Sequence, residues 1–355
     1  MQTAHKTFFS DSRQMSKLAD GSVHLVVTSP PYPMIEMWDE MFKHQNPEID
    51  KYINTGNGTN AFELMHELLD EVWKELYRVL RPGGFACINI GDATRTLNGN
   101  FELYTNHARI LTSAQKLGFC ALPSILWRKQ TNAPNKFMGS GMLPAGAYVT
   151  LEHEHVLILR KGGKREFTKE SQRQNRRESA LFWEERNQWF SDVWLDLKGT
   201  RQALGDKETR SRSAAFPFEL AYRLINMYSV KGDLVVDPFL GMGTTVLAAM
   251  AAGRHSVGYE IDETLAETNH GLKQESLPMF DKVIKGRLEA HVEFVRKRLD
   301  SGKTLKHQNS HYGFPVMTRQ EKELIINQPV SIDTKDSSHI LVNYALTPQP
   351  EFCSN

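Results

Sequence analysis

Residues 28–32, with the sequence Thr-Ser-Pro-Pro-Tyr, combine groups that could hold an amine attached to a flat ring. They directly follow a short apolar run rich in β-branched residues (23–27, VHLVV), which predicts a buried parallel strand. The strand must end at the two prolines, because proline donates no backbone hydrogen bond and fixes its own φ angle. The turn then presents the Ser29 hydroxyl, the Pro30 carbonyl and the Tyr32 ring at a strand end, where open α/β sheets bind ligands. A plain strand-terminating turn is the alternative interpretation.

A second pattern lies much later in the chain. Asp237 ends a predicted strand, Gly241 and Gly243 lead into a predicted helix, and Glu260 ends the next strand, where an acidic residue can bind ribose hydroxyls. Val246 stands where a dinucleotide fingerprint would have its third glycine, and the loop lacks the lysine of a phosphate-binding loop. We therefore expect a nucleoside pocket without a pyrophosphate grip, with acidic residues for a cationic group. S-adenosylmethionine fits that description.

The composition is that of a globular protein, with 40% hydrophobic residues, 24% charged residues and a formal net charge of +1 in 355 residues. Three widely spaced cysteines argue against a disulfide scaffold or a cysteine zinc site. His153 and His155 would share one face of a strand beside two glutamates, but we expect no metal. No apolar stretch approaches membrane-spanning length and no signal peptide is evident, so we expect a cytoplasmic protein without a membrane partner.

Alternating strand and helix patterns predict an α/β fold with a mostly parallel sheet. Strands are expected at 6–10, 23–27, 85–90, 121–128, 149–159, 234–237 and 255–259, and helices at 62–80, 103–117, 216–228 and 244–252. Residues 33–60 lack a sustained period and are interpreted as a long, mobile loop beside the turn, serving as a lid or as plain surface. Beyond residue 271 the pattern weakens to a charged helix near 289–299 and strand-like pieces around 323–326 and 339–345.

The sequence DPFLGMGTT at 237–245, taken together with TSPPY, resembles the amino-methyltransferases of DNA, which methylate N4 of cytosine or N6 of adenine. The catalytic tetrapeptide precedes the cofactor loop, as in the permuted β-type arrangement of that family. The resemblance covers roughly residues 6–265 and implies a Rossmann-like methyltransferase sheet with the catalytic half before the cofactor half. The catalytic turn that it implies consists of Ser29, Pro30, Pro31 and Tyr32.

The resemblance also implies where S-adenosylmethionine binds. Glu260 would hold the ribose hydroxyls, Asp11 would contact the adenine ring, and the phenylalanine of Ala215-Phe216-Pro217 would lie against the methionine end. The cofactor-binding residues implied are Asp11, Thr28, Phe216, Pro217, Asp237, Pro238, Phe239, Gly241, Gly243, Thr244, Thr245 and Glu260.

A serine at the first tetrapeptide position resembles the N4-cytosine subgroup, whereas the N6-adenine enzymes mostly carry aspartate or asparagine there. Hydrogen bonds from the amine to the Ser29 hydroxyl and the Pro30 carbonyl would align the nitrogen for direct displacement at a sulfonium. The base would flip out of the duplex and Tyr32 would stack on it. Adenine-N6 methylation is the nearest alternative. An RNA or protein amine methyltransferase and a DNA-binding module with a relict pocket are further ones.

Residues 160–212 break the alternating pattern and are rich in basic side chains, which can neutralise DNA phosphates. A solvated charged surface is the alternative, but the position between the two halves favours target recognition. The candidate DNA-binding residues are Lys161, Lys164, Arg165, Arg173, Arg176 and Arg177.

We therefore divide the chain into a catalytic half (1–159), a recognition region (160–212), a cofactor half (213–270) and an extension of open role (271–355). Double-stranded DNA is the expected partner. The chain has no nuclease motif, so a cognate restriction endonuclease would be a separate protein, and the choice between monomer and dimer stays open.

Overall fold

The structure is a computed structural model that describes residues 1–129, 138–197, 216–266, 269, 271, 275–336 and 338–353. Its centre is a mixed sheet built by β1 (Gln2–Phe9), β2 (Val23–Thr28), β3 (Leu80–Ile90), β6 (Phe119–Arg128), β9 (His153–Lys161), β10 (Val193–Trp194), β11 (Leu234–Asp237), β12 (His255–Glu260), β15 (Pro329–Asp336) and β16 (His339–Tyr344). The strand order is β10-β6-β9-β3-β2-β11-β12-β1-β16-β15.

The central strands β3, β2, β11, β12 and β1 all run parallel. Their carboxyl ends therefore meet at one edge of the sheet, called the carboxyl edge below, and their amino ends form the opposite amino edge. β9 is antiparallel to both β3 and β6, so β6 points the same way as β3. The predicted α/β fold with a mostly parallel sheet is confirmed.

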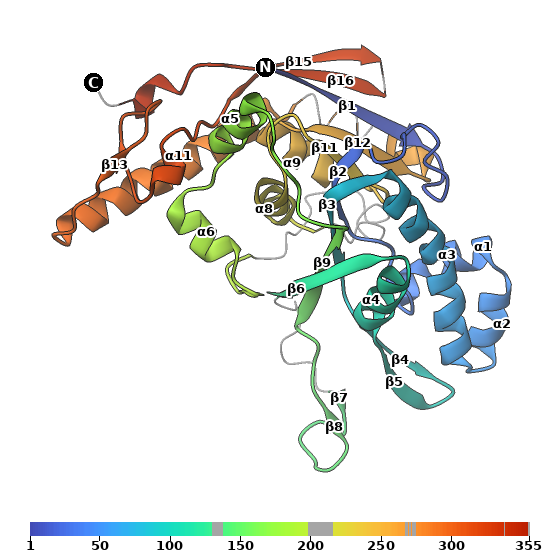
Figure 1. Cartoon of the computed structure of the whole chain (residues 1–355). Helices are drawn as coiled ribbons and strands as arrows, with labels where there is room; N and C mark the ends of the chain where they lie inside the picture. Colours follow the sequence, from blue (N-terminus) through green and yellow to red (C-terminus); the bar gives the residue numbers. More distant parts are fainter. Residues whose placement is uncertain are drawn as a thin grey trace.

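Alternate residues of β2 explain why the sheet is covered on both faces. Val26 packs into one core cluster, whereas Leu25 and Val27 pack into another, as the two-residue period of a strand requires. These faces are covered by helices on either side of the sheet (Figure 1). They are α3 (Gly58–Val79) and α4 (Asn106–Lys116) on one side, and α8 (Phe218–Tyr228) and α9 (Thr244–Ala252) on the other.

The segment 33–60, predicted as a long loop, is largely helical. It holds a 3-10 turn, η1 (Glu36–Trp38), and two short helices, α1 (Asp39–Gln45) and α2 (Glu48–Asn54). Helices of seven residues span about two turns, too few for a sustained sequence period. Phe42 and Ile49 are buried, so packing rather than propensity holds these helices. The prediction of a mobile loop is therefore wrong.

Two β-hairpins project from the carboxyl edge (Figure 1). The first pairs β4 (Ala93–Leu97) with β5 (Asn100–Tyr104) through the dipeptide Asn98-Gly99, where both residues have positive φ angles of 48° and 81°. Such a dipeptide is a strong hairpin signal, although the sequence prediction began a helix at residue 103. The second pairs β7 (Met138–Gly139) with β8 (Ala147–Tyr148) and follows β6. The Phe101 and Tyr148 rings stack at 4.8 Å and connect the two hairpins.

The described part of the predicted recognition region packs against the core. It contains α5 (Glu170–Glu178), α6 (Trp183–Trp189) and β10, which joins the sheet beside β6. Trp189 and Trp194 are buried in the same core cluster as α8 and α9. Residues 198–212 of this region, like Ala215, lie outside the described residues.

The six basic residues predicted to bind DNA lie away from the catalytic turn. Phe85 pairs with Arg160 and Ile90 pairs with His155, so β9 ends at the amino edge of the sheet. Lys161 donates to the Tyr77 carbonyl at 2.5 Å. Three arginines pair with carboxylates: Arg165 with Asp233, Arg173 with Glu170 and Arg177 with Glu323. Arg176 lies over the Phe167 ring, and Lys164 is exposed. Five of the six residues are thus engaged within the protein, at an edge remote from the turn, which argues against a role in target recognition.

The carboxyl-terminal extension continues the main sheet. β16 pairs antiparallel with β1, and β15 pairs with β16. The predicted charged helix is α11 (Leu277–Asp300), much longer than expected, and Phe280 anchors it in the core. The piece expected at 323–326 is not a strand. None of the helices among the described residues is long and apolar enough to cross a membrane.

Arg165 should act on stability rather than on DNA affinity. Its guanidinium donates two hydrogen bonds to Asp233, at 2.5 and 2.9 Å, and the Asp233 side chain is only 4% exposed. Arg165→Gln leaves this buried carboxylate without its main cation and should lower the free energy of unfolding by about 3 kcal/mol. The exposed Arg173→Gln, measured by the same denaturant titration, should lower it by less than about 1 kcal/mol. Equal stability of the two variants would contradict this assignment.

Candidate active site

The turn predicted to be catalytic, residues 28–32, meets the loop predicted to bind the cofactor, residues 237–245, at the carboxyl edge. β2 and β11 are neighbours in the sheet, so their ends lie side by side. The Thr28 hydroxyl donates to one Asp237 carboxylate oxygen at 2.6 Å, and the Thr245 hydroxyl donates to the other at 2.7 Å. Asp237 thus connects the two predicted motifs directly.

The two motifs line one cavity of about 730 Å³. Its wall includes eleven of the predicted site residues: Asp11, Ser29, Pro30, Pro31, Phe216, Asp237, Pro238, Phe239, Gly241, Thr244 and Glu260. The remaining five are Thr28, Tyr32, Pro217, Gly243 and Thr245, none of which is part of the wall. Thr28 and Thr245 donate hydrogen bonds to the Asp237 carboxylate. Gly243 precedes α9 with a φ angle of 82°, a conformation that favours glycine.

Burial raises the pKa values of two acidic groups, one in the cofactor loop and one at the end of β12. It raises the pKa of Asp237 to about 6, against the opposing effect of hydrogen bonds from Thr28 and Thr245. Burial also raises the pKa of Glu260, whose oxygens accept from the backbone amides of Gly241 at 2.7 Å and Asp262 at 2.9 Å. The wall therefore offers the buried Asp237 carboxylate to a cationic ligand and the Glu260 carboxylate, at a strand end, to a diol, which fits a nucleoside with a cationic chain.

The segment before α2 supplies a wall that the sequence analysis missed. Trp38, Met41 and Phe42 recur at helical spacing and line the same cavity as the cofactor loop. This i, i+3, i+4 spacing was the available signal. The Asp39 carboxylate holds α1 in place by accepting two hydrogen bonds from Arg95 of the first hairpin, at 2.8 and 2.6 Å.

The Tyr32 side chain is buried behind the turn and does not line the cavity. The residue is only 7% exposed, and a side chain at Gly91 would come within 3.0 Å of its ring. The predicted stacking of a base on this ring therefore requires the ring to be uncovered first. The Tyr32 hydroxyl instead donates to the Glu154 carboxylate on β9 at 3.0 Å.

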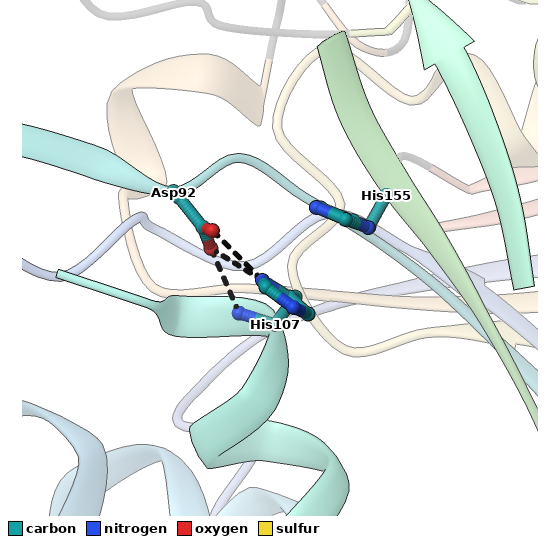
Figure 2. A group of neighbouring side chains, drawn as sticks. All are labelled: Asp92, His107 and His155. Atoms are coloured by element: carbon teal, nitrogen blue, oxygen red, sulfur yellow. Dashed lines mark hydrogen bonds and ion pairs between the residues drawn. The ribbon is translucent and has the colours of Figure 1, made fainter. Parts of the chain in front are cut away.

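A cluster of Asp92, His107 and His155 lies beside this region, as Figure 2 shows. The Asp92 carboxylate contacts His107 Nδ1 at 2.8 and 2.9 Å and accepts from its backbone amide at 3.1 Å. The two imidazole rings stack at 3.9 Å with only 14° between their planes. Because a ring nitrogen binds a metal within the plane of its ring, two nearly parallel rings do not converge on one ion. As placed, the cluster orients His107 and does not form a metal cage.

Comparisons with known proteins agree with this geometry. A family of DNA methylases of the N6/N4 type matches residues 23–270. The type II methyltransferase M.MthZI of Methanothermobacter thermautotrophicus is 51% identical over 93% of this chain and 92% of its own length. The type II methyltransferase M.MjaI of Methanocaldococcus jannaschii is 48% identical over 83% of this chain and 97% of its own length.

A solved structure shares the same fold. It is a putative DNA modification methylase of Thermus thermophilus, determined in complex with S-adenosyl-L-methionine. It is 31% identical, covers 77% of this chain and 95% of its own, and has a TM-score of 0.61. The family match includes both the catalytic turn and the cofactor loop, and the resemblance seen in the sequence is confirmed. The chain belongs to the N6/N4 family of DNA methylases.

Proposed function

We propose that the protein transfers a methyl group from S-adenosylmethionine to the N4 amine of a cytosine flipped out of duplex DNA. The observation that carries this proposal is the shared cavity. Ser29 and Pro30 line it together with Asp237, Phe239, Gly241 and Thr244 of the cofactor loop. An amine held at the turn would therefore lie beside a methyl donor held at the loop.

The cofactor-binding part of the proposal rests on the chemistry of the wall. Asp237 and Glu260 would hold the cationic and ribose portions, and Asp11 and Phe216 complete the same wall. When bound there, S-adenosylmethionine supplies an electrophilic methyl group on a sulfonium. The protein's own contribution is to exclude water and to align the amine.

The turn is suited to accept both hydrogens of an exocyclic amine. One would go to the Ser29 hydroxyl oxygen and the other to the Pro30 carbonyl, which withdraws the nitrogen lone pair from the ring. No covalent enzyme intermediate is required. Cys87 is fully buried, and burial raises its thiol pKa far above the usual range, so it does not supply a nucleophile.

Cytosine is proposed over adenine because a serine occupies the first position of the tetrapeptide. The target is proposed to be duplex DNA approaching the carboxyl edge, where the cavity lies and from which both hairpins project (Figure 1). A separately encoded restriction endonuclease with the same recognition site is the proposed partner in the cell.

Methyl transfer to DNA in vitro tests the proposed reaction itself. Purified protein should transfer labelled methyl groups from S-adenosylmethionine to duplex DNA, and Ser29→Ala should reduce the rate at least about 100-fold, since it removes one amine acceptor. Calorimetry should find unchanged cofactor binding in this variant. Hydrolysis of the product DNA should yield N4-methylcytosine. N6-methyladenine would overturn the choice of base, and unmodified DNA would overturn the reaction.

Cofactor affinity should depend on pH through Asp237. In the free protein Asp237 is protonated below about pH 6, and a bound cation lowers its pKa because it favours the charged carboxylate. Cofactor affinity should therefore rise as the pH increases toward 6 and level off above it, by about tenfold for each unit of pKa lowering. Calorimetry from pH 5 to 7 measures this. Asp237→Asn should bind more weakly and without this slope, and an unchanged slope would refute the assignment.

The tip of the second hairpin, β7–β8, offers exposed apolar side chains to DNA. Met142 and Leu143 are 83% and 71% exposed at its tip, and apolar side chains at such positions can enter the space left by unstacked bases. Replacing both by serine should weaken binding of duplex DNA about tenfold, the effect of roughly 1.4 kcal/mol, and leave cofactor affinity unchanged. Leu346→Ser is the control, because Leu346 is 70% exposed just beyond β16, near the amino edge. Equal DNA affinities for both variants would exclude a role for the hairpin tip.

A further inference from the structure

A buried chain of hydrogen bonds runs behind the catalytic turn. The Ser29 hydroxyl donates to the Tyr32 hydroxyl at 3.1 Å, and the Tyr32 hydroxyl donates to a Glu154 carboxylate oxygen at 3.0 Å. Tyr32 and Glu154 are only 7% and 8% exposed. A buried carboxylate is therefore connected to the hydroxyl of Ser29, a residue that lines the cavity.

Asn89 determines the direction of these hydrogen bonds. Its side-chain nitrogen donates to the Tyr32 hydroxyl at 2.9 Å and to the same Glu154 oxygen at 2.6 Å. The reverse amide orientation would bring a carbonyl oxygen equally close to the carboxylate. An amide nitrogen only donates and a carboxylate only accepts. The Tyr32 hydrogen must therefore point to Glu154, and the Ser29 hydrogen must point to Tyr32.

This direction determines what Ser29 can offer to a substrate. Its single hydrogen is committed to Tyr32, so its lone pairs remain for the cavity. Burial and the neighbouring Glu154 charge raise the pKa of Tyr32 well above its ordinary value, so the phenol stays protonated and keeps donating to Glu154. A serine held in this way accepts a hydrogen bond from an amine and does not donate one to it.

We propose that Glu154 is a positioning residue for methyl transfer, which acts through Tyr32 to hold Ser29 as an acceptor and takes up the proton that the amine releases. This inference rests on the proposed function and adds to it a residue on β9, outside both sequence motifs.

The proton balance follows the chain of hydrogen bonds. The amine nitrogen uses its lone pair to form the bond to the methyl carbon, and the sulfur–methyl bond breaks with its electron pair returning to sulfur. The nitrogen then loses one proton to the Ser29 oxygen. Ser29 passes its own proton to the Tyr32 oxygen, and Tyr32 passes its proton to Glu154. The serine and the tyrosine end neutral, and the carboxylate ends protonated.

Lys129 stabilises the buried Glu154 carboxylate. Its ammonium donates to the second Glu154 oxygen at 2.8 Å, which offsets part of the cost of burying a charge. The Lys129 side chain is 41% exposed, so it also connects Glu154, the end of the hydrogen-bond chain, to solvent. A proton on Glu154 can leave by this side after each turnover.

The test compares Glu154→Gln, Tyr32→Phe and the double variant in single-turnover transfer of labelled methyl groups to duplex DNA. Each single change should slow the transfer about 100-fold, while the dissociation constants for the cofactor and for DNA change less than about threefold. Because both residues act through one chain of hydrogen bonds, the double variant should be no slower than the slower single variant. Glu154→Asp keeps a carboxylate and should recover part of the rate.

The control is Glu323→Gln, which removes a carboxylate paired with Arg177 near the amino edge and should leave the rate unchanged. Wild-type rates in both Glu154→Gln and Tyr32→Phe would overturn the positioning role and leave the proposed function standing. Independent, multiplying losses in the double variant would also overturn it. If Glu154→Gln does not fold, the single-turnover rate of Tyr32→Phe alone decides whether the positioning role holds. A wild-type protein that methylates no DNA would refute the proposed function together with this inference.

Discussion

The Asp237 carboxylate, buried between the hydroxyls of Thr28 and Thr245, joins two parts of the chain that are far apart in sequence. One threonine ends the strand before the catalytic turn, and the other opens the helix after the cofactor loop. The carboxylate also accepts from the Phe239 backbone amide at 3.0 Å, which shapes the loop itself. This side chain therefore fixes the relative position of the turn and the loop together with the pairing of β2 with β11. Because direct transfer between two bound groups is sensitive to their alignment, the rest of the site depends on this contact.

A second buried carboxylate has a comparable task at the other end of the turn. Glu154 fixes the direction of the Tyr32 and Ser29 hydroxyls, much as Asp237 fixes those of Thr28 and Thr245. In both places a low-polarity environment makes an unpaired polar group costly, so the hydroxyls have few alternative orientations. The catalytic turn is thus held from two sides, by β11 and by β9. Its two prolines add backbone stiffness, and hydrogen bonds set the orientation of its hydroxyls.

Sequence signals were sufficient to single out two segments at the ends of parallel strands, which the structure brings to one cavity. The turn after β2 and the loop after β11 were identified because strand ends, glycines and prolines have local sequence signals. The signal for α1 was weaker, since two helical turns are too short for a clear period and Phe42 is held by tertiary packing. Glu154 was hidden within a Glu-His-Glu-His run, where alternation gives the face of the strand but not the neighbours of that face.

The basic stretch after β9 illustrates a different limit. A count of positive charges does not say at which edge of a sheet they lie, and the direction of β9 sends this stretch to the amino edge. The positions of Arg165 and Lys161 follow from pairing with Asp233 and with the Tyr77 carbonyl, which no local pattern encodes. The face for DNA is inferred instead from the cavity and from the hairpins that project beside it.

The central claim is that this cavity methylates the N4 amine of cytosine in DNA. Sequencing that distinguishes methylated bases, applied to DNA from cells that express the chain, reports the base and its sequence context together. The account predicts N4-methylcytosine at one fixed sequence context, and its absence in cells that express Ser29→Ala. Methylated adenine at a fixed context would contradict the assignment of the base, and unmodified DNA in cells that contain folded protein would contradict the account as a whole.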